Sequence, residues 1–272
     1  MFFGHERGFA DVFFIYLKQL NILENMRKFY FVIGISLVSI LLTLSSCKKN
    51  NDPAPVIPDD IKYTNAIKDA MVAEESEISH NLIAINDSNN YLSWTGTGTD
   101  KKVLVVTWTK YPGSFPVGTT ITNSWGTIWV TVVPEIKDWY KKHNYPAGTD
   151  FILRTEQLMG LSKNRGYTHF AELWVKPQDL YRPSPDNEIT DNTAQLNFPP
   201  GVDSAYKAWF NGNIIYSYYP MSFPWTRLGY TYDWCGCGTE IGMSEFVIKQ
   251  NSQLTVNRLT DNATFFSEIS QK

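Results

Sequence analysis

The sequence is poor in the residues that most often bind metal ions. Its 272 residues include three cysteines and four histidines. A structural zinc site needs four ligands, and no two histidines stand at metal-binding spacing. We therefore expect no metal site and no cofactor.

Sequence signatures of two large hydrolase classes are also missing. Neither Gly-x-Ser-x-Gly nor His-Glu-x-x-His occurs, which argues against a serine hydrolase with a nucleophile elbow and against a zincin. Glycoside hydrolysis stays open, because it requires only two carboxyl groups flanking the scissile bond. The candidate carboxylates are Glu172, Asp186, Asp233 and Glu245.

An excess of positive charge is absent as well. The formal net charge is −3, and beyond residue 46 there are 20 basic and 24 acidic residues. A protein that binds nucleic acid presents a basic patch to the phosphates. We expect no nucleic-acid partner.

The clearest pattern in the sequence lies near its amino terminus. Met26-Arg27-Lys28 precede a nearly uncharged run from Phe29 to Leu44, which leads into Leu44-Ser45-Ser46-Cys47. This is the order of a signal peptide: a basic segment, an apolar segment and small residues before a cleavage point. The apolar run of about 16 residues is shorter than the ~20 that a membrane-spanning helix needs.

The four residues Leu44-Ser45-Ser46-Cys47 resemble the lipobox of bacterial lipoproteins. The resemblance implies that Cys47 is thioether-linked to diacylglycerol, becomes the new amino terminus and tethers the protein to a membrane. Each buried CH₂ contributes ~0.8 kcal/mol, so two or three acyl chains hold a protein firmly. Lysine follows the cysteine, as in outer-membrane lipoproteins, and either face of that membrane is compatible with the pattern.

These assignments divide the chain into four parts. Residues 26–46 are the expected signal peptide, and residues 47–60, with three prolines and many polar side chains, form an extended tether. Charged residues interrupt the apolar stretches of residues 1–25, so we expect translation to start at Met26 and this preface to be a gene-model artefact. Residues 61–272 are long enough for one globular domain.

Helical and strand-like patterns are interleaved along this domain without a strict βαβ repeat. The expected helices cover residues 60–78, a segment opened by Pro134, residues 150–160 and residues 204–210, the last ended by Asn211-Gly212. The expected strands cover residues 91–95, 103–109, 127–133 and 169–175, with a final hairpin of 244–249 and 253–258. The pattern predicts an α+β fold: a single domain with a mostly antiparallel sheet of about six or seven strands and three or four helices.

Two of these elements carry charged side chains of interest. Arg154 and Gln157 lie on one face of a helix, which is either a site or a solvated surface. Glu172 shares a strand face with Phe170 and Trp174. A carboxyl group between two aromatic rings can have a raised pKa that suits a general acid, but we favour a simple ion pair with an arginine.

Two further segments leave their roles open. The loop Tyr181-Arg182-Pro183-Ser184-Pro185-Asp186 is stiffened by two prolines, and either presents Arg182 to a ligand or only fixes its own conformation. Cys235 and Cys237 are separated by one residue. They form a small disulfide or stay as thiols, or they act as metal ligands or as a redox pair.

The densest concentration of aromatic and charged residues is the segment 224–234, which includes Trp225 and Arg227. In an extended backbone its residues Tyr230, Tyr232 and Trp234 share one side. Such a row suits a platform for sugar rings or a peptide. The alternative is a core strand in which Arg227 pairs with Asp233.

The tether, the aromatic surplus and the lack of a catalytic signature favour a non-catalytic envelope lipoprotein. Its domain would bind a glycan, a peptide or a protein partner, through residues that include Arg182 and the segment 224–234. The alternative is a glycan hydrolase that uses two of the four candidate carboxylates.

The lipobox assignment makes a direct prediction. The native protein extracted from membranes should have the mass of residues 47–272 plus a diacylglyceryl group, measured by intact mass spectrometry. Cys47→Ala should release the domain or leave an uncleaved precursor. A mature, membrane-bound Cys47→Ala protein would contradict the assignment.

Overall fold

The computed structural model describes residues 56–146 and 148–270, and from Ile57 onward the chain forms one compact unit. The signal-peptide and lipobox assignments lie outside these residues. Among the described residues, no helix is long and apolar enough to cross a membrane. The fold class predicted from the sequence is confirmed, because five helices surround a mostly antiparallel sheet in one α+β domain.

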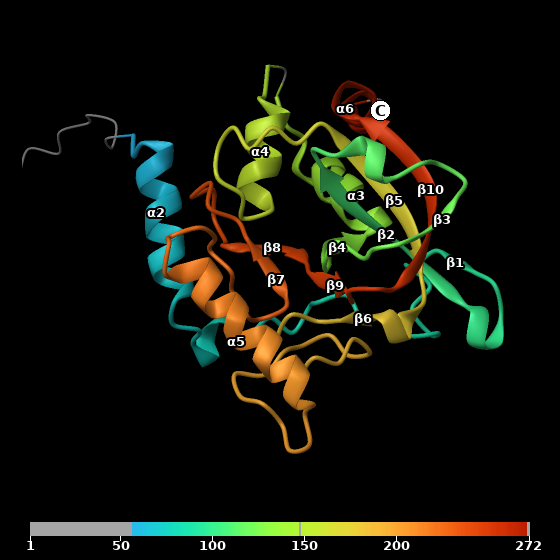
Figure 1. Ribbon diagram of the computed structural model, residues 1–272. Coiled ribbons are helices and arrows are strands. Elements are labelled where there is room, and N and C mark those ends of the chain that lie inside the picture. The colour runs from blue at the N-terminus through green and yellow to red at the C-terminus, as the bar shows by residue number, and fades with distance from the viewer. Residues whose placement is uncertain (1–55, 147, 271–272) are drawn as a thin grey trace, which may run out of the picture. The chain divides into compact units, whose positions relative to one another are not determined.

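The main sheet has eight strands in the order β3-β10-β5-β2-β4-β9-β6, with β1 paired to β2 (Figure 1). Every pairing within it is antiparallel. A small second sheet pairs β7 with β8. The strands are β1 Trp94–Thr95, β2 Lys102–Thr109, β3 Thr120–Thr122, β4 Ile128–Val132, β5 His169–Val175, β6 Leu180–Tyr181, β7 Tyr230–Tyr232, β8 Ile241–Ser244, β9 Phe246–Ile248 and β10 Gln253–Asp261.

Three of the five helices of the described residues begin where the sequence supplies suitable amino-terminal residues. Pro134 occupies the first turn of α3, where a missing N–H does no harm. Asp150 accepts a hydrogen bond from the Leu153 N–H at 3.0 Å and caps α4. Asp203 caps α5 in the same way. The helices are α2 Asp59–Ala70, α3 Val133–His143, α4 Phe151–Leu158, α5 Ser204–Tyr218 and α6 Asn262–Ser270.

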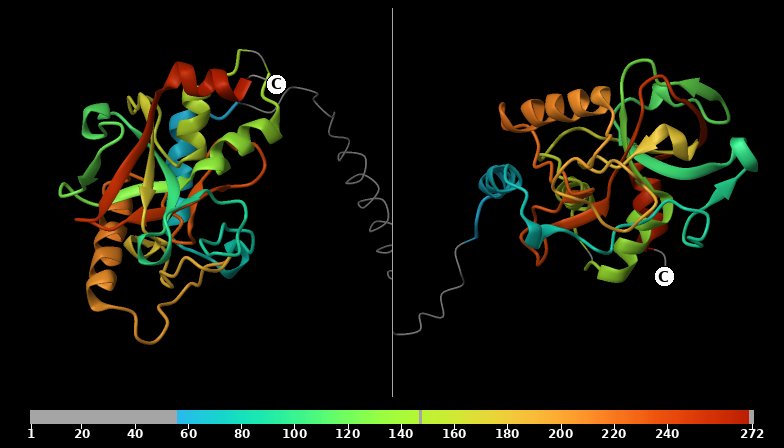
Figure 2. Two further views of the ribbon diagram at one scale, coloured as in Figure 1. Left: turned by 90° about the vertical axis from the view of Figure 1, so that its right-hand side faces the viewer. Right: turned by 90° about the horizontal axis from the view of Figure 1, so that it is seen from below.

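Strand alternation divides the core into layers. The inner-facing residues of β2, Val103 and Val105, belong to a cluster that the curled sheet encloses. On the opposite face, Val106 and Trp108 pack beneath α3 and α6. Figure 2 shows α6 lying across one end of the sheet. Strand β2 is therefore covered on both faces.

Two helix boundaries and the final hairpin differ from the expectations. The first helix stops at Ala70 and not at residue 78, because Arg227 donates hydrogen bonds to the carbonyl oxygens of Ala70 and Met71 and ends it there. Helix α5 continues through Asn211-Gly212 to Tyr218. Its buried stripe carries on beyond the glycine, and this packing outweighs the low helix propensity of Gly212.

The expected hairpin of 244–249 and 253–258 is wrong. Strand β9 pairs with β4 and β6, whereas β10 pairs with β3 and β5, so three strands separate them in the sheet. The connection from Ile248 to Gln253 can span at most roughly 18 Å, whereas four flat strand spacings are about 19 Å. Because the connection also turns, the sheet must curl to bring β9 toward β10.

A buried ion pair joins α4 to the segment that follows β7. Arg154 and Asp233 form a two-pronged ion pair, with Nη1 donating to Oδ1 at 3.0 Å and Nη2 to Oδ2. The Arg154 Nε donates to the Tyr145 hydroxyl at 2.8 Å, and the guanidinium lies 4.6 Å from the centre of the Trp139 ring. Both charged side chains are almost fully buried. The expected pairing of Arg227 with Asp233, and the solvated face at Arg154, are therefore wrong.

Removing one member of this pair should lower the free energy of unfolding substantially. Asp233→Asn leaves a buried guanidinium without its counter-ion, and we expect a loss of about 3–5 kcal/mol in the free energy of unfolding, measured by urea denaturation. The control is Lys163→Met, which breaks the exposed pair with Asp59 and should cost no more than about 1 kcal/mol. Equal losses in the two variants would contradict a stabilising role for the buried pair.

Candidate functional site

A cavity opens in the main sheet where β2 and β4 separate. These strands pair only at Val105 with Val132 and at Val106 with Thr131. Further along, β2 stays paired with β5 as far as Thr109, and β4 stays paired with β9. Residues 107–109 and 128–130 therefore line opposite walls of a cavity of about 620 Å³, a volume typical of small-ligand sites.

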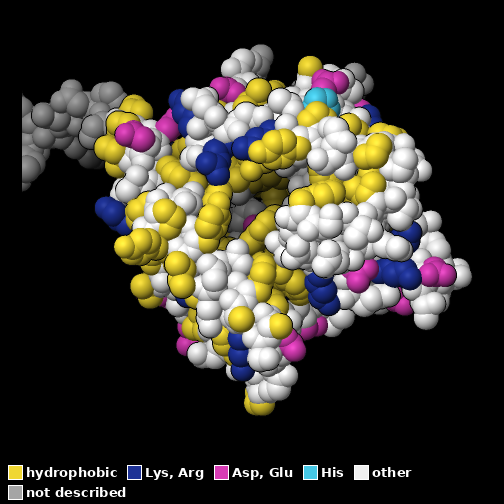
Figure 3. Space-filling view, in the orientation of Figure 1, with side chains coloured by type: hydrophobic (Ala, Val, Ile, Leu, Met, Phe, Trp, Pro, Cys, Tyr) yellow, Lys and Arg dark blue, Asp and Glu magenta, His cyan; other side chains and the backbone are white. Residues whose placement is uncertain are grey.

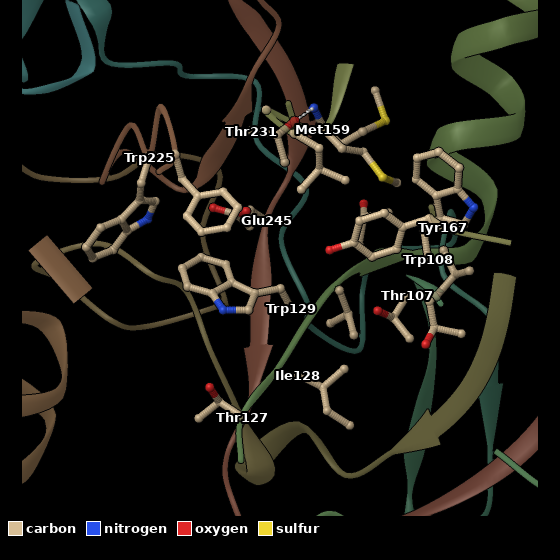
Figure 4. Close-up of a pocket in the computed structure, with 18 of the residues that line it drawn as sticks. Thr107, Trp108, Thr127, Ile128, Trp129, Met159, Tyr167, Trp225, Thr231 and Glu245 are labelled. Carbon is tan, nitrogen blue, oxygen red and sulfur yellow. Dashed lines mark hydrogen bonds between the residues drawn. The ribbon is translucent and has the colours of Figure 1, made fainter. Parts of the chain in front are cut away.

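The cavity walls are mainly aromatic. Figure 4 shows Trp129, Trp225 and Glu245 on one side and Thr107, Trp108 and Tyr167 on the other. The Trp129 and Trp225 rings meet edge to face at 5.8 Å between centres, and Trp108 stacks on Tyr167 at 5.1 Å. Figure 3 shows that hydrophobic side chains surround the open mouth of this hollow.

Polar groups interrupt this apolar lining at intervals. Hydroxyl groups come from strands, from α5 and from the segments between these elements. The described lining has one acidic residue, Glu245, and one basic residue, Lys110. Lys110 is exposed at the mouth. The serine and threonine residues that line the cavity include Thr107, Thr109, Thr127, Thr131, Ser114 and Ser217.

Glu245 lies between β8 and β9, and its backbone N–H donates to the Gly229 carbonyl oxygen at 2.9 Å. Extending the β4–β9 register by one step places it opposite Thr131, on the face that carries Trp129. Its Oε2 atom is buried without a hydrogen-bond partner among the described residues. Burial raises the pKa of Glu245 to about 8, because the charged carboxylate loses its hydration.

The nearby Glu135 carboxyl is also buried but is fully bonded. It accepts a hydrogen bond from the Ser244 N–H at 2.8 Å and another from the Thr131 hydroxyl. Burial raises the pKa of Glu135 to about 7, against the effect of these hydrogen bonds. Glu135 therefore joins α3 to β4 and β8, whereas Glu245 faces the cavity.

The aromatic row of the segment 224–234 packs largely beneath α2 and the turn that follows it. The Tyr230 hydroxyl donates to the Glu77 carbonyl oxygen at 2.9 Å, and the Tyr232 hydroxyl donates to Asp69 at 2.8 Å. The Trp234 ring meets Tyr63 edge to face. Tyr230, Tyr232 and Trp225 contribute to the cavity wall, whereas Trp234 lies away from it.

The two arginines predicted to bind a ligand hold the fold together instead. Arg182 has no exposed surface; its guanidinium donates to the carbonyl oxygens of Ile83, Glu188 and Asp191. Burial lowers the pKa of Arg182. Arg227 binds the carboxyl end of α2, where a cation is favourable.

The other candidate carboxylates lie away from the cavity. Asp186 accepts hydrogen bonds from Ser184 and from the Gln195 N–H, so the loop 181–186 fixes its own conformation. Asp233 is occupied by Arg154. Glu172 is hydrogen-bonded to Asn257, which also accepts from Trp174, and the neighbouring Arg258 pairs with Glu268 and not with it. Glu245 is thus the single one of the four that lines the cavity.

Cys235 and Cys237 form a disulfide. Lys62 of α2 donates to the Cys235 carbonyl oxygen at 3.0 Å, so the bridged loop helps to hold that helix. Within the described residues, no three His, Cys, Asp or Glu side chains are grouped to hold a metal ion.

Sequence reasoning missed much of the cavity. Trp108, Trp129 and Tyr167 come from strands and loops far apart in the chain, and Trp125 and Tyr216 from segments for which no site was expected. The aromatic content was the available signal, but the separation of β2 from β4 depends on pairings that no local pattern specifies. Comparisons with protein-family models, curated protein sequences and solved structures found no match.

The buried carboxyl makes stability depend on pH. The folded protein holds the Glu245 proton up to about pH 8, whereas the ordinary pKa is 4.5, so between these values the unfolded chain binds fewer protons and stability falls as pH rises. Glu245→Gln should therefore become progressively more stable than the wild type, with the ratio of their unfolding constants changing by up to about tenfold per pH unit. Urea unfolding at pH 5, 6, 7, 8 and 9 measures this difference.

The matched control is Glu75→Gln, which makes the same change at an exposed side chain. The difference in the free energy of unfolding between Glu75→Gln and the wild type should not change with pH as the difference for Glu245→Gln does. If Glu245→Gln and the wild type keep a constant difference from pH 5 to 8, the Glu245 carboxyl is not held protonated by the fold.

Proposed function

We propose that this protein is a lipid-anchored lipoprotein of the bacterial cell envelope, and that its non-catalytic domain binds a glycan segment in the aromatic cavity.

 The cavity is the main support for this proposal. It has a volume of about 620 Å³, its walls are aromatic rings, and hydroxyl groups lie at its edges. The anchor rests on the lipobox resemblance at Cys47, with the outer membrane as the expected location.

The form of the site favours a glycan over the other two ligand classes. A protein partner usually needs about 800 Å² of surface on each side, whereas this site is a concave hollow (Figure 3). Sugar rings have apolar faces that stack on aromatic side chains and hydroxyl groups that exchange hydrogen bonds with threonine and serine. The cavity offers both kinds of surface side by side.

Aromatic side chains continue from the cavity onto its rim. Tyr111, Trp125 and Tyr216 line the cavity, yet their exposed fractions are 63%, 56% and 64%. Exposed aromatic side chains at the edge of a concave site are typical of binding surfaces. The rim therefore supports a ligand that extends out of the cavity, as a chain of sugars does.

The structure gives less support to the alternative of a glycan hydrolase. Such enzymes hold two carboxyl groups about 5–9.5 Å apart on either side of the scissile bond. Glu245 is the single acidic residue in the described lining of the cavity. Its raised pKa would suit a general acid, but no second carboxyl group of the lining is there to act as nucleophile or base.

A glycan array probed with the purified full-length protein tests the proposal. We expect binding to a subset of envelope saccharides, and Tyr216→Ala should weaken it on the order of tenfold, because an aromatic rim contact is lost. Isothermal titration with the best array ligand measures the change. The bound saccharide should keep its chain length during incubation, as checked by mass spectrometry.

Helix α5 supplies a matched control at its carboxyl end. Tyr219 is 88% exposed and does not line the cavity, so Tyr219→Ala should bind as the wild type does. The absence of any array ligand, or equal losses in the two tyrosine variants, would overturn the proposal. Shortened saccharide products would favour the hydrolase.

A further inference from the structure

We infer that the cavity recognises a positively charged amino group, carried by the saccharide and placed beside the Glu245 carboxylate. The inference deepens the proposed function and rests on it. It names the chemical feature that separates the preferred ligand from neutral saccharides of the same size.

One oxygen atom of the Glu245 carboxyl group has no hydrogen-bond partner among the described residues. This atom, Oε2, is buried, and the Glu245 backbone is held by Gly229. Buried polar groups in folded proteins are almost always paired, so each exception requires an explanation. A group that is left unpaired on a cavity wall is available to a ligand.

The surroundings of Glu245 suit an organic cation. Trp129 shares its strand face, and Trp225 meets Trp129 edge to face. The faces of tryptophan rings attract ammonium groups, and more strongly when water is excluded. A carboxylate and aromatic rings in one cavity thus present two attractive features to the same ammonium group.

A metal ion fits this site less well. Calcium takes six to eight oxygen ligands, and magnesium needs a near-octahedral set. The lining supplies Glu245 as its single carboxylate, and the described residues contain no group of acidic side chains that could hold a metal. An ammonium group needs one carboxylate and tolerates apolar surroundings.

The other titratable groups around the cavity do not compete for the carboxylate. Tyr218 of α5 is close enough for Glu245 to act on it electrostatically, and burial raises the pKa of Tyr218 to about 12. Burial also raises the pKa values of Tyr230 and Tyr232 on β7, so all three phenols stay neutral near pH 7. Lys110 at the mouth is exposed, where salt screens its charge.

Binding an ammonium group must ionise Glu245. In the free protein the carboxyl group holds its proton below about pH 8, and the bound cation favours the carboxylate. The O–H bond of the acid breaks, the proton leaves to the solvent, and the ion pair forms without any redox change. A neutral saccharide does not favour the carboxylate over the acid, so the proton stays on Glu245 when it binds.

The test compares glucosamine tetrasaccharide with its fully N-acetylated counterpart, by isothermal titration of the purified full-length protein at pH 6. Titrations in buffers of different ionisation enthalpy report the protons released. We expect tighter binding of the amino form and release of about one proton per ligand. Glu245→Gln should weaken binding of the amino form on the order of 10- to 100-fold, abolish proton release and leave the N-acetylated form unaffected.

Glu75→Gln is the control, and it should bind both saccharides as the wild type does. If the wild type binds the two saccharides equally and without proton release, and Glu245→Gln does the same, this inference is overturned. The proposed function then stands. Binding of neither saccharide, together with an array on which nothing binds, would overturn both.

Discussion

The short pairing between β2 and β4 is the constraint on which the site depends. Two residue pairs hold these strands together, after which each strand follows its other neighbour, β5 or β9. A continuous ladder along both strands would close the sheet and remove the cavity. The curl of the sheet follows from a second constraint, because a short connection between β9 and β10 must join strands that lie far apart in the strand order.

The helices stabilise this open sheet from outside. Helices α3 and α6 cover one face through an aromatic cluster, and α2 and α5 meet around a second cluster that includes Trp225 and Val247. Polar contacts fix the position of α2: Arg227 binds its carboxyl end, and Tyr232 binds Asp69. The aromatic residues of segment 224–234 therefore serve the fold and the cavity wall at once, which explains why they resemble both a core strand and a platform.

The sequence allowed the fold class and most elements to be predicted, because these depend on local patterns. The strand 169–175 was placed correctly, and Pro134 and Asp150 marked the starts of two helices. Errors arose where distant contacts decide the outcome. Gly212 lies inside α5 because the helix packs on both sides of it, and the strands on either side of the turn at Asn251 pair with different neighbours.

The candidate site was harder to predict for the same reason. Glu245 was among the four proposed carboxylates, but its neighbours on the cavity wall, Trp129 and Trp225, come from two other segments. The charged residues that looked most suited to a ligand, Arg182 and Asp233, are buried in structural contacts. A charge in the sequence does not reveal whether its partner will be another residue of the chain or a ligand.

Comparison of the buried carboxyl groups bears on that question for Glu245. Asp233 is paired with Arg154, Glu156 accepts two backbone N–H groups from the loop at residues 164–165, and Glu135 is held by Thr131 and Ser244. This domain therefore supplies partners to the acidic groups that it buries for structural reasons. A buried carboxyl without a hydrogen bond destabilises the free protein, and an apolar side chain at this position would avoid that cost. The placement of a carboxyl group on the cavity wall is best explained by a ligand that supplies the missing partner.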